Sequence, residues 1–289
     1  MKAQLIDGKR ISAEIKAEAA EEAAALKAKG ITPCLAVVLV GDDSASQVYV
    51  NNKKKACEAV GIRSVSHVLS GETTEEALLE LIAKLNADKD IHGILVQMPV
   101  PKQIDERKVI LAIDPKKDVD CFHPVNVGNL HTGGEGFLPC TPAGIIELIK
   151  RSGHSIEGKQ CVVIGRSNIV GKPVAMLLMQ ENGTVTICHS KTRNLAEICR
   201  GADIIVSAVG KVNTVTADMV KEGAILIDVG MNRNEAGKLC GDVDFENVKE
   251  IAGAITPVPG GVGPMTIAML MKNCNTAAKS RMDWNKEEL

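Results

Sequence analysis

The segment Gln160–Leu178 carries residue types that could hold a dinucleotide. Its sequence, QCVVIGRSNIVGKPVAMLL, begins as a buried strand, passes through a turn that starts at Gly165 and continues as a helix that begins near Gly171. A helix N-terminus offers free N–H groups and a partial positive charge, and glycine lets the backbone approach an anion closely. The pattern therefore predicts that this turn binds the diphosphate of a nicotinamide dinucleotide.

Three other glycine motifs fail on the same residues. A Walker A loop has four residues between its glycines and then Lys-Ser/Thr, whereas here five residues separate the glycines and Pro173 follows Lys172. A hydrolase nucleophile has glycine two positions after its serine, but Ile169 stands there. The usual G-x-G-x-x-G fingerprint also fails, because Ser167 replaces its second glycine, so dinucleotide binding is expected as a variant. An ordinary strand–helix turn, with glycines for steric reasons alone, is the alternative.

The residues after the next predicted strand indicate whether the cofactor is NAD or NADP. Enzymes that use NAD usually place an acidic residue near the end of that strand, where it binds the ribose 2′-hydroxyl. Here the strand at 184–188 runs into His-Ser-Lys-Thr-Arg at 189–193, without an acid. Hydroxyl and cationic groups, in particular Ser190 and Arg193, suit a 2′-phosphate. The sequence therefore favours NADP over NAD.

A helix predicted from Ser44 to about Val60 is the second place where chemistry is expected. Ser46, Tyr49 and Lys53 share one of its faces because they are spaced by successive helical turns. A single tyrosine beside a lysine could form the floor of a pocket for an aromatic ligand. The competing interpretation is that Lys53 belongs to a solvated charge run with the two lysines after it. An apolar stripe is expected beside this face, at Ala45, Val48, Ala56 and Ala59.

Two further segments of the first half supply polar groups. Gln97 stands at the carboxyl end of a strand expected at 91–98, where parallel sheets bind ligands, although a plain loop explains it equally well. The run Lys117-Asp118-Val119-Asp120 lies in an irregular stretch at 114–140. Aspartates in loops usually form turns, so these residues alone do not indicate a site.

Strand and helix patterns alternate along almost the whole chain, which predicts mainly parallel sheets covered by helices. A long irregular stretch such as that at 114–140 is usually either functional or the mark of a domain junction. The final helix, expected from Met265 to about Ala278, is apolar nearly all round and should be buried against the first domain or at a subunit interface.

We therefore expect an α/β fold of two domains, the second Rossmann-like, with a cleft between them. The expected domains are residues 1–138 with 267–289, and residues 139–266. The expected strands are at 35–40, 62–69, 91–98, 160–164, 184–188, 204–209, 224–229 and 254–256.

The composition excludes several classes of protein. The chain has 289 residues, 45% of them hydrophobic and 24% charged, which suits one large or two medium domains. A net charge of -2 gives no electrostatic reason to expect nucleic acid or an anionic membrane as a partner. The apolar runs are too short to cross a bilayer. Nine cysteines without a C-x-x-C pair, and no secretory segment, indicate reduced thiols in the cytoplasm. The six histidines form no cluster, so no metal site is expected.

Taken together, these segments resemble one family over nearly the whole chain, the bifunctional methylenetetrahydrofolate dehydrogenase/cyclohydrolases. Their order and spacing make the resemblance specific. The matching segments are Tyr49-Val50-x-x-Lys53, Val96-Gln97-Met98-Pro99, Lys117-Asp118-Val119-Asp120, Pro139-Cys140-Thr141-Pro142, Gly165-Arg166-Ser167-x-Ile169-Val170-Gly171-x-Pro173 and Thr256-Pro257-Val258-Pro259-Gly260-Gly261-Val262-Gly263-Pro264-Met265-Thr266.

The resemblance implies two successive reactions on one folate. NADP⁺ takes a hydride from 5,10-methylenetetrahydrofolate, and water then opens the 5,10-methenyl product to 10-formyltetrahydrofolate. The counterpart of Lys53 is the main catalytic residue of the family, and that of Gln97 helps set the protonation state of the lysine. The counterpart of Asp120 hydrogen-bonds the pterin, and that of Tyr49 stacks on the aminobenzoate ring.

The resemblance also implies a cofactor site and an assembly. The loop from Gly260 to Pro264 would close over the junction between folate and nicotinamide, and the family is usually homodimeric through its cofactor domain. The positions that match cofactor contacts in the family are Gly165, Arg166, Ser167, Ser190 and Met231.

The sequence departs from the family pattern at two positions, and two other classes of protein are alternatives. Cys121 follows Asp120 where the family usually has glycine, which leaves the local pterin geometry in question; Val212 replaces a common proline without expected catalytic consequence. A dehydrogenase-only relative, often NAD-linked, would lack the counterpart of Lys53. A non-catalytic NADP-binding protein would not need Tyr49, Lys53, Gln97 and Asp120 together.

Overall fold

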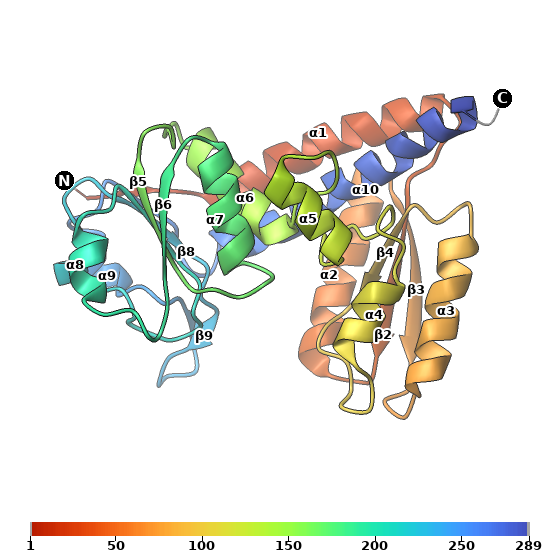
Figure 1. Ribbon diagram of the computed structural model, residues 1–289, viewed down its shortest axis with the longest axis horizontal. Helices are drawn as coiled ribbons and strands as arrows, with labels where there is room; N and C mark the ends of the chain where they lie inside the picture. Colours follow the sequence, from red (N-terminus) through yellow and green to blue (C-terminus); the bar gives the residue numbers. More distant parts are fainter. Residues whose placement is uncertain (1, 288–289) are drawn as a thin grey trace. The chain divides into compact units, whose positions relative to one another are not determined.

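The computed structural model describes residues 2–287 and divides into two compact units. The six-stranded unit consists of the residues up to Ala13 and Pro139–Thr266, and the three-stranded unit consists of Glu14–Leu138 and the chain from Ile267 onward. Figure 1 shows the elements of both units. Both are sheets covered by helices, which confirms the predicted α/β class.

The six-stranded unit is a doubly wound parallel sheet. Its strands, in order across the sheet, are β1 (Gln4–Leu5), β11 (Ala254–Ile255), β8 (Ile225–Asp228), β7 (Ile204–Ser207), β5 (Gln160–Ile164) and β6 (Thr184–Cys188). All the neighbouring pairs are parallel. The strand order reverses between β5 and β7, and ligands of such sheets bind outside the carboxyl ends of the strands at that switch point.

Helices cover both faces of this sheet. One face packs against α8 (Leu195–Arg200), a 3-10 turn (Ala217–Met219) and α9 (Phe245–Val248) through a shared apolar core. The other face is covered by α6 (Cys140–Arg151) and α7 (Gly171–Gln180), as Figure 1 shows. A two-stranded hairpin, β9 (Asn232–Arg233) with β10 (Leu239–Cys240), extends from the unit.

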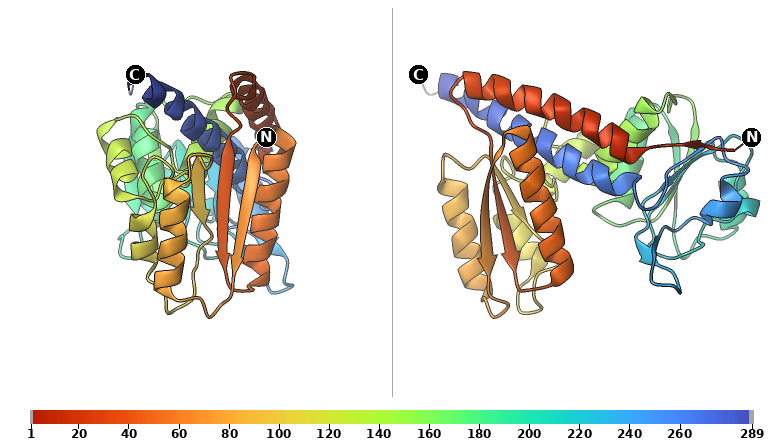
Figure 2. Two further views of the ribbon diagram at one scale, coloured as in Figure 1. Left: turned by 90° about the vertical axis from the view of Figure 1, so that its right-hand side faces the viewer. Right: turned by 180° about the vertical axis from the view of Figure 1, so that it is seen from behind.

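The three-stranded unit has the strand order β3 (Arg63–Leu69), β2 (Cys34–Val40) and β4 (Gly93–Val96), all parallel. The central strand β2 is buried along its whole length, as its run of apolar residues predicts. The apolar core on one face is shared with α3 (Glu75–Ala87) and α4 (Glu106–Ala112), whereas α2 (Ser44–Val60) packs on the other face (Figure 2).

Two long helices contain residues of both units. The unit boundaries fall inside α1 (Gly8–Ala28) and α10 (Val262–Glu287). Within the three-stranded unit, Nδ2 of Asn275 in α10 donates a hydrogen bond of 2.8 Å to the carbonyl oxygen of Ala19 in α1. The cleft expected between the two domains stays a prediction.

The structure differs from the sequence-based expectation in two segments. Residues 2–13 were expected in the first domain but belong to the six-stranded unit, because Gln4 and Leu5 pair with β11. The stretch expected to be irregular at 114–140 contains α5 (Pro124–Thr132), which His123 caps by accepting a hydrogen bond of 3.2 Å from the Val125 N–H. A two-residue strand and a helix of sequence PVNVGNLHT carry little periodic signal.

Candidate active site

Lys53 lies on the buried face of α2. The residues of this face are Ser46, Val50, Lys53, Cys57 and Val60, at the i, i+3/i+4, i+7 spacing of a helix packed on a sheet. Lys53 is 9% exposed, whereas Lys54 and Lys55 are exposed. The lysine run is therefore not uniformly solvated.

The apolar stripe predicted beside Lys53 was wrong in part. Ala56 is buried, but Val48 is 57% exposed and Ala59 is also exposed. The physical reason is that the helix turns its Val50–Cys57 side to the sheet. Ala45 lies outside the residues whose side chains the structure describes. Tyr49 is 41% exposed and stands one helical turn before Lys53.

Gln97 accepts a hydrogen bond from Lys53. The distance from Lys53 Nζ to Gln97 Oε1 is 2.9 Å, and Gln97 Nε2 donates to the Met98 carbonyl oxygen at 2.8 Å. A lysine ammonium only donates and a carbonyl only accepts, so these two partners fix which end of the amide faces Lys53. The Gln97 N–H also donates to the Val38 carbonyl at 2.8 Å, which anchors the residue to the end of the sheet.

The carboxyl of Asp120 interacts electrostatically with Lys53. Burial raises the pKa of its carboxyl to about 6; the Lys53 cation opposes this rise and the neighbouring Asp118 adds to it. The structure thus brings together three sequence-predicted residues from three segments of the three-stranded unit: Lys53, Gln97 and Asp120.

The segment that carries Asp120 is held by residues whose positioning role the sequence reasoning missed. Nζ of the buried Lys117 donates to the carbonyl oxygens of Leu85, Asn86 and Asp88 at 2.9, 2.7 and 2.7 Å, and so caps the end of α3. Asp118 Oδ2 accepts from the His123 N–H at 2.8 Å and from Asn126 Nδ2 at 2.9 Å. Asn273 Nδ2 of α10 donates to the Val119 carbonyl at 2.8 Å. No local pattern could have found Asn273, because 154 positions separate it from Val119.

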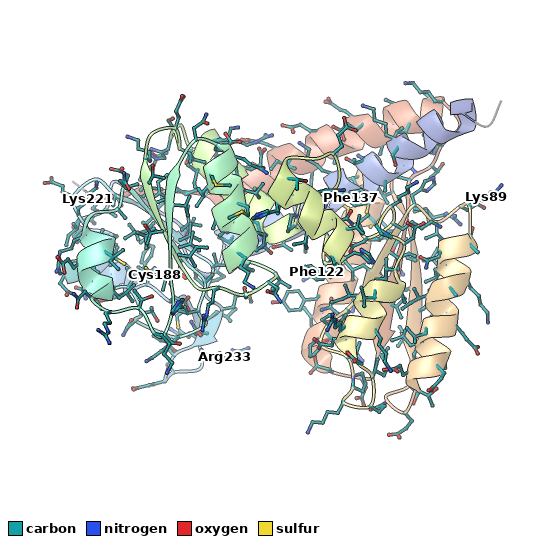
Figure 3. All side chains as sticks on the ribbon, viewed as in Figure 1. Lys89, Phe122, Phe137, Cys188, Lys221 and Arg233 are labelled. Carbon is teal, nitrogen blue, oxygen red and sulfur yellow. The ribbon has the colours of Figure 1, made fainter. Side chains whose placement is uncertain are left out.

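The turn after Asp120 contains a strained cysteine. Cys121 has φ 61°, a left-handed conformation that glycine adopts without steric cost. Its buried Sγ donates to the carbonyl oxygen of Phe137 at 3.0 Å; Phe137 is labelled in Figure 3. The turn thus keeps a backbone conformation that suits glycine, although this chain has cysteine there.

In the six-stranded unit, the turn after β5 packs tightly on two neighbours. Gly165 has φ 128°, and a Cβ at that position would overlap the carbonyl oxygen of Ala208. A Cβ on Gly171 would overlap the carbonyl of Gly165. Ser167 Oγ accepts from the N–H groups of Val170 and Gly171 at 3.2 Å each. Strand, turn and helix are as predicted, but two amides at the start of α7 are engaged within the turn itself.

A cavity of about 730 Å³ lies at the carboxyl ends of β5, β6 and β7. Arg166 and Lys211 supply cationic groups to its lining, and no acidic residue is among the lining residues. It is lined by Ile164, Gly165, Arg166, His189, Ser190, Leu195, Ala208, Val209, Lys211, Asn213 and Thr214. The lining residues that follow β7, such as Ala208 and Lys211, could have been expected from the switch-point rule, because β7 is the strand next to β5.

Not every predicted cofactor residue lines this cavity. Gly165, Arg166 and Ser190 do, whereas Ser167, Arg193 and Met231 are outside its lining. Met231 precedes the β9 hairpin and is 57% exposed.

The Gly260–Pro264 loop belongs to the six-stranded unit. Gly260 has φ 107°, and Pro264 lies in the first turn of α10. A Cβ on Gly8 of α1 would overlap the Gly261 carbonyl, so α1 packs directly on this loop. A hydrogen bond connects α6 to α10 just after this loop, because Thr141 Oγ1 and Thr266 Oγ1 are 2.8 Å apart.

Among residues 2–287, no group of His, Cys, Asp and Glu is arranged to hold a metal ion. In the same part of the chain, every helix is too short or too polar to cross a membrane. A doubly wound sheet with a cationic cavity at its switch point, and a buried lysine held by glutamine beside an aspartate in the other unit, define a nucleotide-dependent α/β enzyme.

Comparison with known families identifies this enzyme class more closely. Residues 6–120 match the family described as tetrahydrofolate dehydrogenase/cyclohydrolase, catalytic domain. Residues 139–282 match the NAD(P)-binding domain of the same family. The chain therefore belongs to the tetrahydrofolate dehydrogenase/cyclohydrolase family.

Relatives agree over nearly the full length. The bifunctional protein FolD of Agathobacter rectalis is 62% identical over 277 residues, which are 96% of this chain and 99% of the relative. The crystal structure of the bifunctional FolD dehydrogenase/cyclohydrolase from Campylobacter jejuni is 53% identical, with a TM-score of 0.94 over 96% of this chain and 99% of that one. The Trypanosoma brucei enzyme, solved with NADP and an inhibitor, is 42% identical, with a TM-score of 0.92 over 98% and 99% of the two chains.

Proposed function

We propose that this chain oxidises 5,10-methylenetetrahydrofolate with NADP and hydrolyses the methenyl product to 10-formyltetrahydrofolate, as an enzyme of one-carbon metabolism. Lys53 held by Gln97 beside Asp120 is the observation that carries the proposal. The high identity to bifunctional relatives over nearly the whole chain supports it. The three-stranded unit, whose sequence matches the family's catalytic domain, holds the folate, and the six-stranded unit binds NADP.

The lining of the cavity in the six-stranded unit supports NADP as the cofactor. A Cβ at Gly165 would overlap the Ala208 carbonyl, so glycine is needed for this turn to pack against Ala208 at the cavity wall. Arg166 and Lys211 can balance phosphate charge, and Ser190 offers a hydroxyl, in a lining without acidic groups. When bound, NADP accepts the hydride. Ser167, Arg193 and Met231 are proposed as further cofactor contacts at the edges of this site.

The hydrolysis step needs proton transfers that Lys53 can supply. Water must lose a proton as it attacks the methenyl carbon, and the departing ring nitrogen must gain one. Gln97 holds Lys53 Nζ at a fixed position through the 2.9 Å hydrogen bond. There the neutral amine can take the proton of the attacking water, and the resulting ammonium can return that proton to the departing nitrogen. The dehydrogenase step asks less of these groups, because the cation that it leaves is delocalised over two nitrogens and needs orientation above all.

The remaining residues orient the folate. As a carboxylate, Asp120 can accept hydrogen bonds from paired N–H groups on the pterin edge. Tyr49, exposed one turn before Lys53, offers a ring on which the aminobenzoate can stack. Gly260 and Pro264 are proposed as folate-side contacts of the loop that begins α10.

One assay tests this function. Incubation with 5,10-methylenetetrahydrofolate and NADP should give NADPH and 10-formyltetrahydrofolate, with the methenyl compound as a transient. NADPH without 10-formyl product would favour a dehydrogenase-only enzyme, against which the hydrogen-bonded Lys53–Gln97 pair argues. Nucleotide binding without turnover would favour a non-catalytic protein. Higher kcat/KM with NAD than with NADP would overturn the cofactor assignment.

The assembly and the compartment are further proposals. We infer a homodimer formed through the six-stranded unit. Support comes from β6, which ends the sheet and has Ile187 37% exposed. Sedimentation should give twice the chain mass of 30.6 kDa. The nine cysteines all lie within the described residues as free thiols, which supports a reducing cytoplasm; there the 10-formyl product would serve purine biosynthesis.

A further inference from the structure

Asp242 is a buried carboxylate that none of the proposed catalytic or binding roles uses. It follows the β10 strand and is 0% exposed. A buried carboxylate is costly to desolvate unless donors surround it. The identity of its donors therefore shows what the carboxylate holds together.

Five donors converge on this side chain from two segments, residues 207–211 and the start of β9. Oδ2 accepts from Ser207 Oγ at 3.1 Å, Val209 N at 2.8 Å and Gly210 N at 3.3 Å. Oδ1 accepts from Lys211 N at 2.9 Å and Asn232 Nδ2 at 2.9 Å. Four of these five donors belong to residues 207–211, the end of β7 and the loop that follows it.

The 207–211 segment is a wall of the nucleotide cavity. Ala208, Val209 and Lys211 are among the lining residues, and the Ala208 carbonyl is the group against which Gly165 packs. Asn232, the donor at the start of β9, directly follows Met231, a proposed cofactor contact. One carboxylate thus joins the 207–211 segment, a wall of the cavity, to the start of β9.

The surroundings leave Asp242 no freedom to move. A Cβ on Gly230 would overlap its Oδ1, and its own N–H donates to Asp228 Oδ1 at 2.9 Å. Asp228 Oδ2 in turn accepts from the Val243 N–H at 2.9 Å. The carboxylate therefore sits on a rigid support.

We propose that Asp242 is a positioning residue for the nucleotide, which it serves by holding the Val209–Lys211 amides in place. This inference rests on the proposed function of the cavity. Only a carboxylate fits the role, because asparagine would present an NH₂ group to N–H and O–H donors.

The test is Asp242→Asn, which keeps the size of the side chain. NADPH is titrated by its fluorescence at a temperature where circular dichroism shows a folded variant. The Kd for NADPH should rise at least about tenfold, as expected when a charged acceptor loses several donors. The dehydrogenase KM for NADP should rise with it more than kcat falls. Hydrolysis of added methenyltetrahydrofolate, which needs no NADP, should stay within about twofold of wild type.

Asp203→Asn is the matched control. Asp203 also accepts a backbone amide, from Gln160 N at 2.7 Å, and pairs with Lys221, but it precedes β7 rather than following it. Figure 3 shows Lys221 and Arg233, which belongs to the β9 hairpin, at opposite ends of this unit. The control should leave the NADPH Kd unchanged.

A folded Asp242→Asn protein that binds NADPH within about twofold of wild type would overturn the inference. If that variant does not fold, Asn232→Ala removes one donor and should raise the Kd about threefold; an unchanged Kd there would equally overturn it. Failure of the wild-type protein to bind NADPH would instead overturn the proposed function.

Discussion

Lys53 Nζ and Gln97 Oε1 lie 2.9 Å apart, although 44 positions separate the two residues in the chain. The pair joins the buried face of α2 to the carboxyl end of β4. Because Gln97 Nε2 is bonded to the Met98 carbonyl, the amide cannot rotate to offer Lys53 a donor without losing that bond. Lys53 therefore faces the carbonyl oxygen of the Gln97 amide and not its NH₂ group.

Removal of this acceptor should impair hydrolysis more than oxidation. For Gln97→Leu we expect the cyclohydrolase kcat to fall about tenfold to a hundredfold, since a hydrogen bond to a charged group stabilises by about 1.5–3 kcal/mol. Gln103→Leu is the control, because Gln103 lies in the same unit and its Nε2 donates only to loop carbonyls, at 2.6 Å to Gly71. Stopped-flow loss of methenyl absorbance measures the step; equal rates in both variants would contradict the role of Gln97.

Because of Asp120, folate binding and the stability of the folded protein should depend on pH in opposite directions. Burial raises the pKa of this carboxyl from 3.8 to about 6, so the carboxylate that accepts pterin N–H groups is lost as pH falls through about 6. We expect the folate KM to rise below that pH. Because the folded protein favours the protonated form, the contribution of Asp120 to stability is largest below pH 3.8 and declines as pH rises through about 6.

Asp120→Asn should therefore separate the two effects. The variant should have a Tm near that of wild type at pH 4.5 and a higher Tm at pH 8, because it lacks the buried charge, and its folate KM should no longer rise toward acid pH. Thermal melts and KM measurements at both pH values check this. A variant that is less stable than wild type at pH 8 would show that the attraction between Asp120 and Lys53 outweighs burial.

Asn273 and Asn275 provide a matched pair on α10. Asn273 Nδ2 donates to the Val119 and Leu138 carbonyls at 2.8 Å each, whereas Asn275 Nδ2 donates to the Ala19 carbonyl at 2.8 Å. Replacement of either by alanine should destabilise the protein by about 1–3 kcal/mol in urea denaturation. Only Asn273→Ala should also raise the folate KM, because Val119 precedes Asp120. A KM effect of equal size in both variants would argue against this positioning role.

Cys121 should resist β-branched substitution. At φ 61° valine is strained, so Cys121→Val should destabilise by about 2–3 kcal/mol. Cys121→Gly should stay within about 1 kcal/mol of wild type, since relief of strain offsets the lost burial of sulfur. Cys34→Val, in the fully buried strand β2, should cost little because valine suits a strand. Chemical denaturation distinguishes these variants; similar values for the two valine variants would contradict a strained turn.

Much of the architecture could be predicted because its signals are local. The strands at 160–164 and 184–188 have the predicted bounds, since β-branched apolar runs between glycines and polar turns define them. The two-residue strand β1 has no such period and takes its place only through pairing with β11.

The site required long-range information. A run of three lysines shows charge but not that Lys53 alone turns inward, because that depends on how α2 packs on β2 and β3. The donors to Asp242 lie up to 35 positions from it, and its sequence context shows only an aspartate between glycine and valine. The resemblance to a known family indicated the catalytic candidates, but not the residues that hold them.

The central claim is that Lys53 performs the hydrolysis but is not required for hydride transfer. Lys53→Met should be tested with NADP and 5,10-methylenetetrahydrofolate while NADPH and methenyl absorbance are followed together. We predict continued formation of NADPH and accumulation of the methenyl compound, with a cyclohydrolase rate at least about a hundredfold below wild type. A full cyclohydrolase rate in this variant would contradict the account.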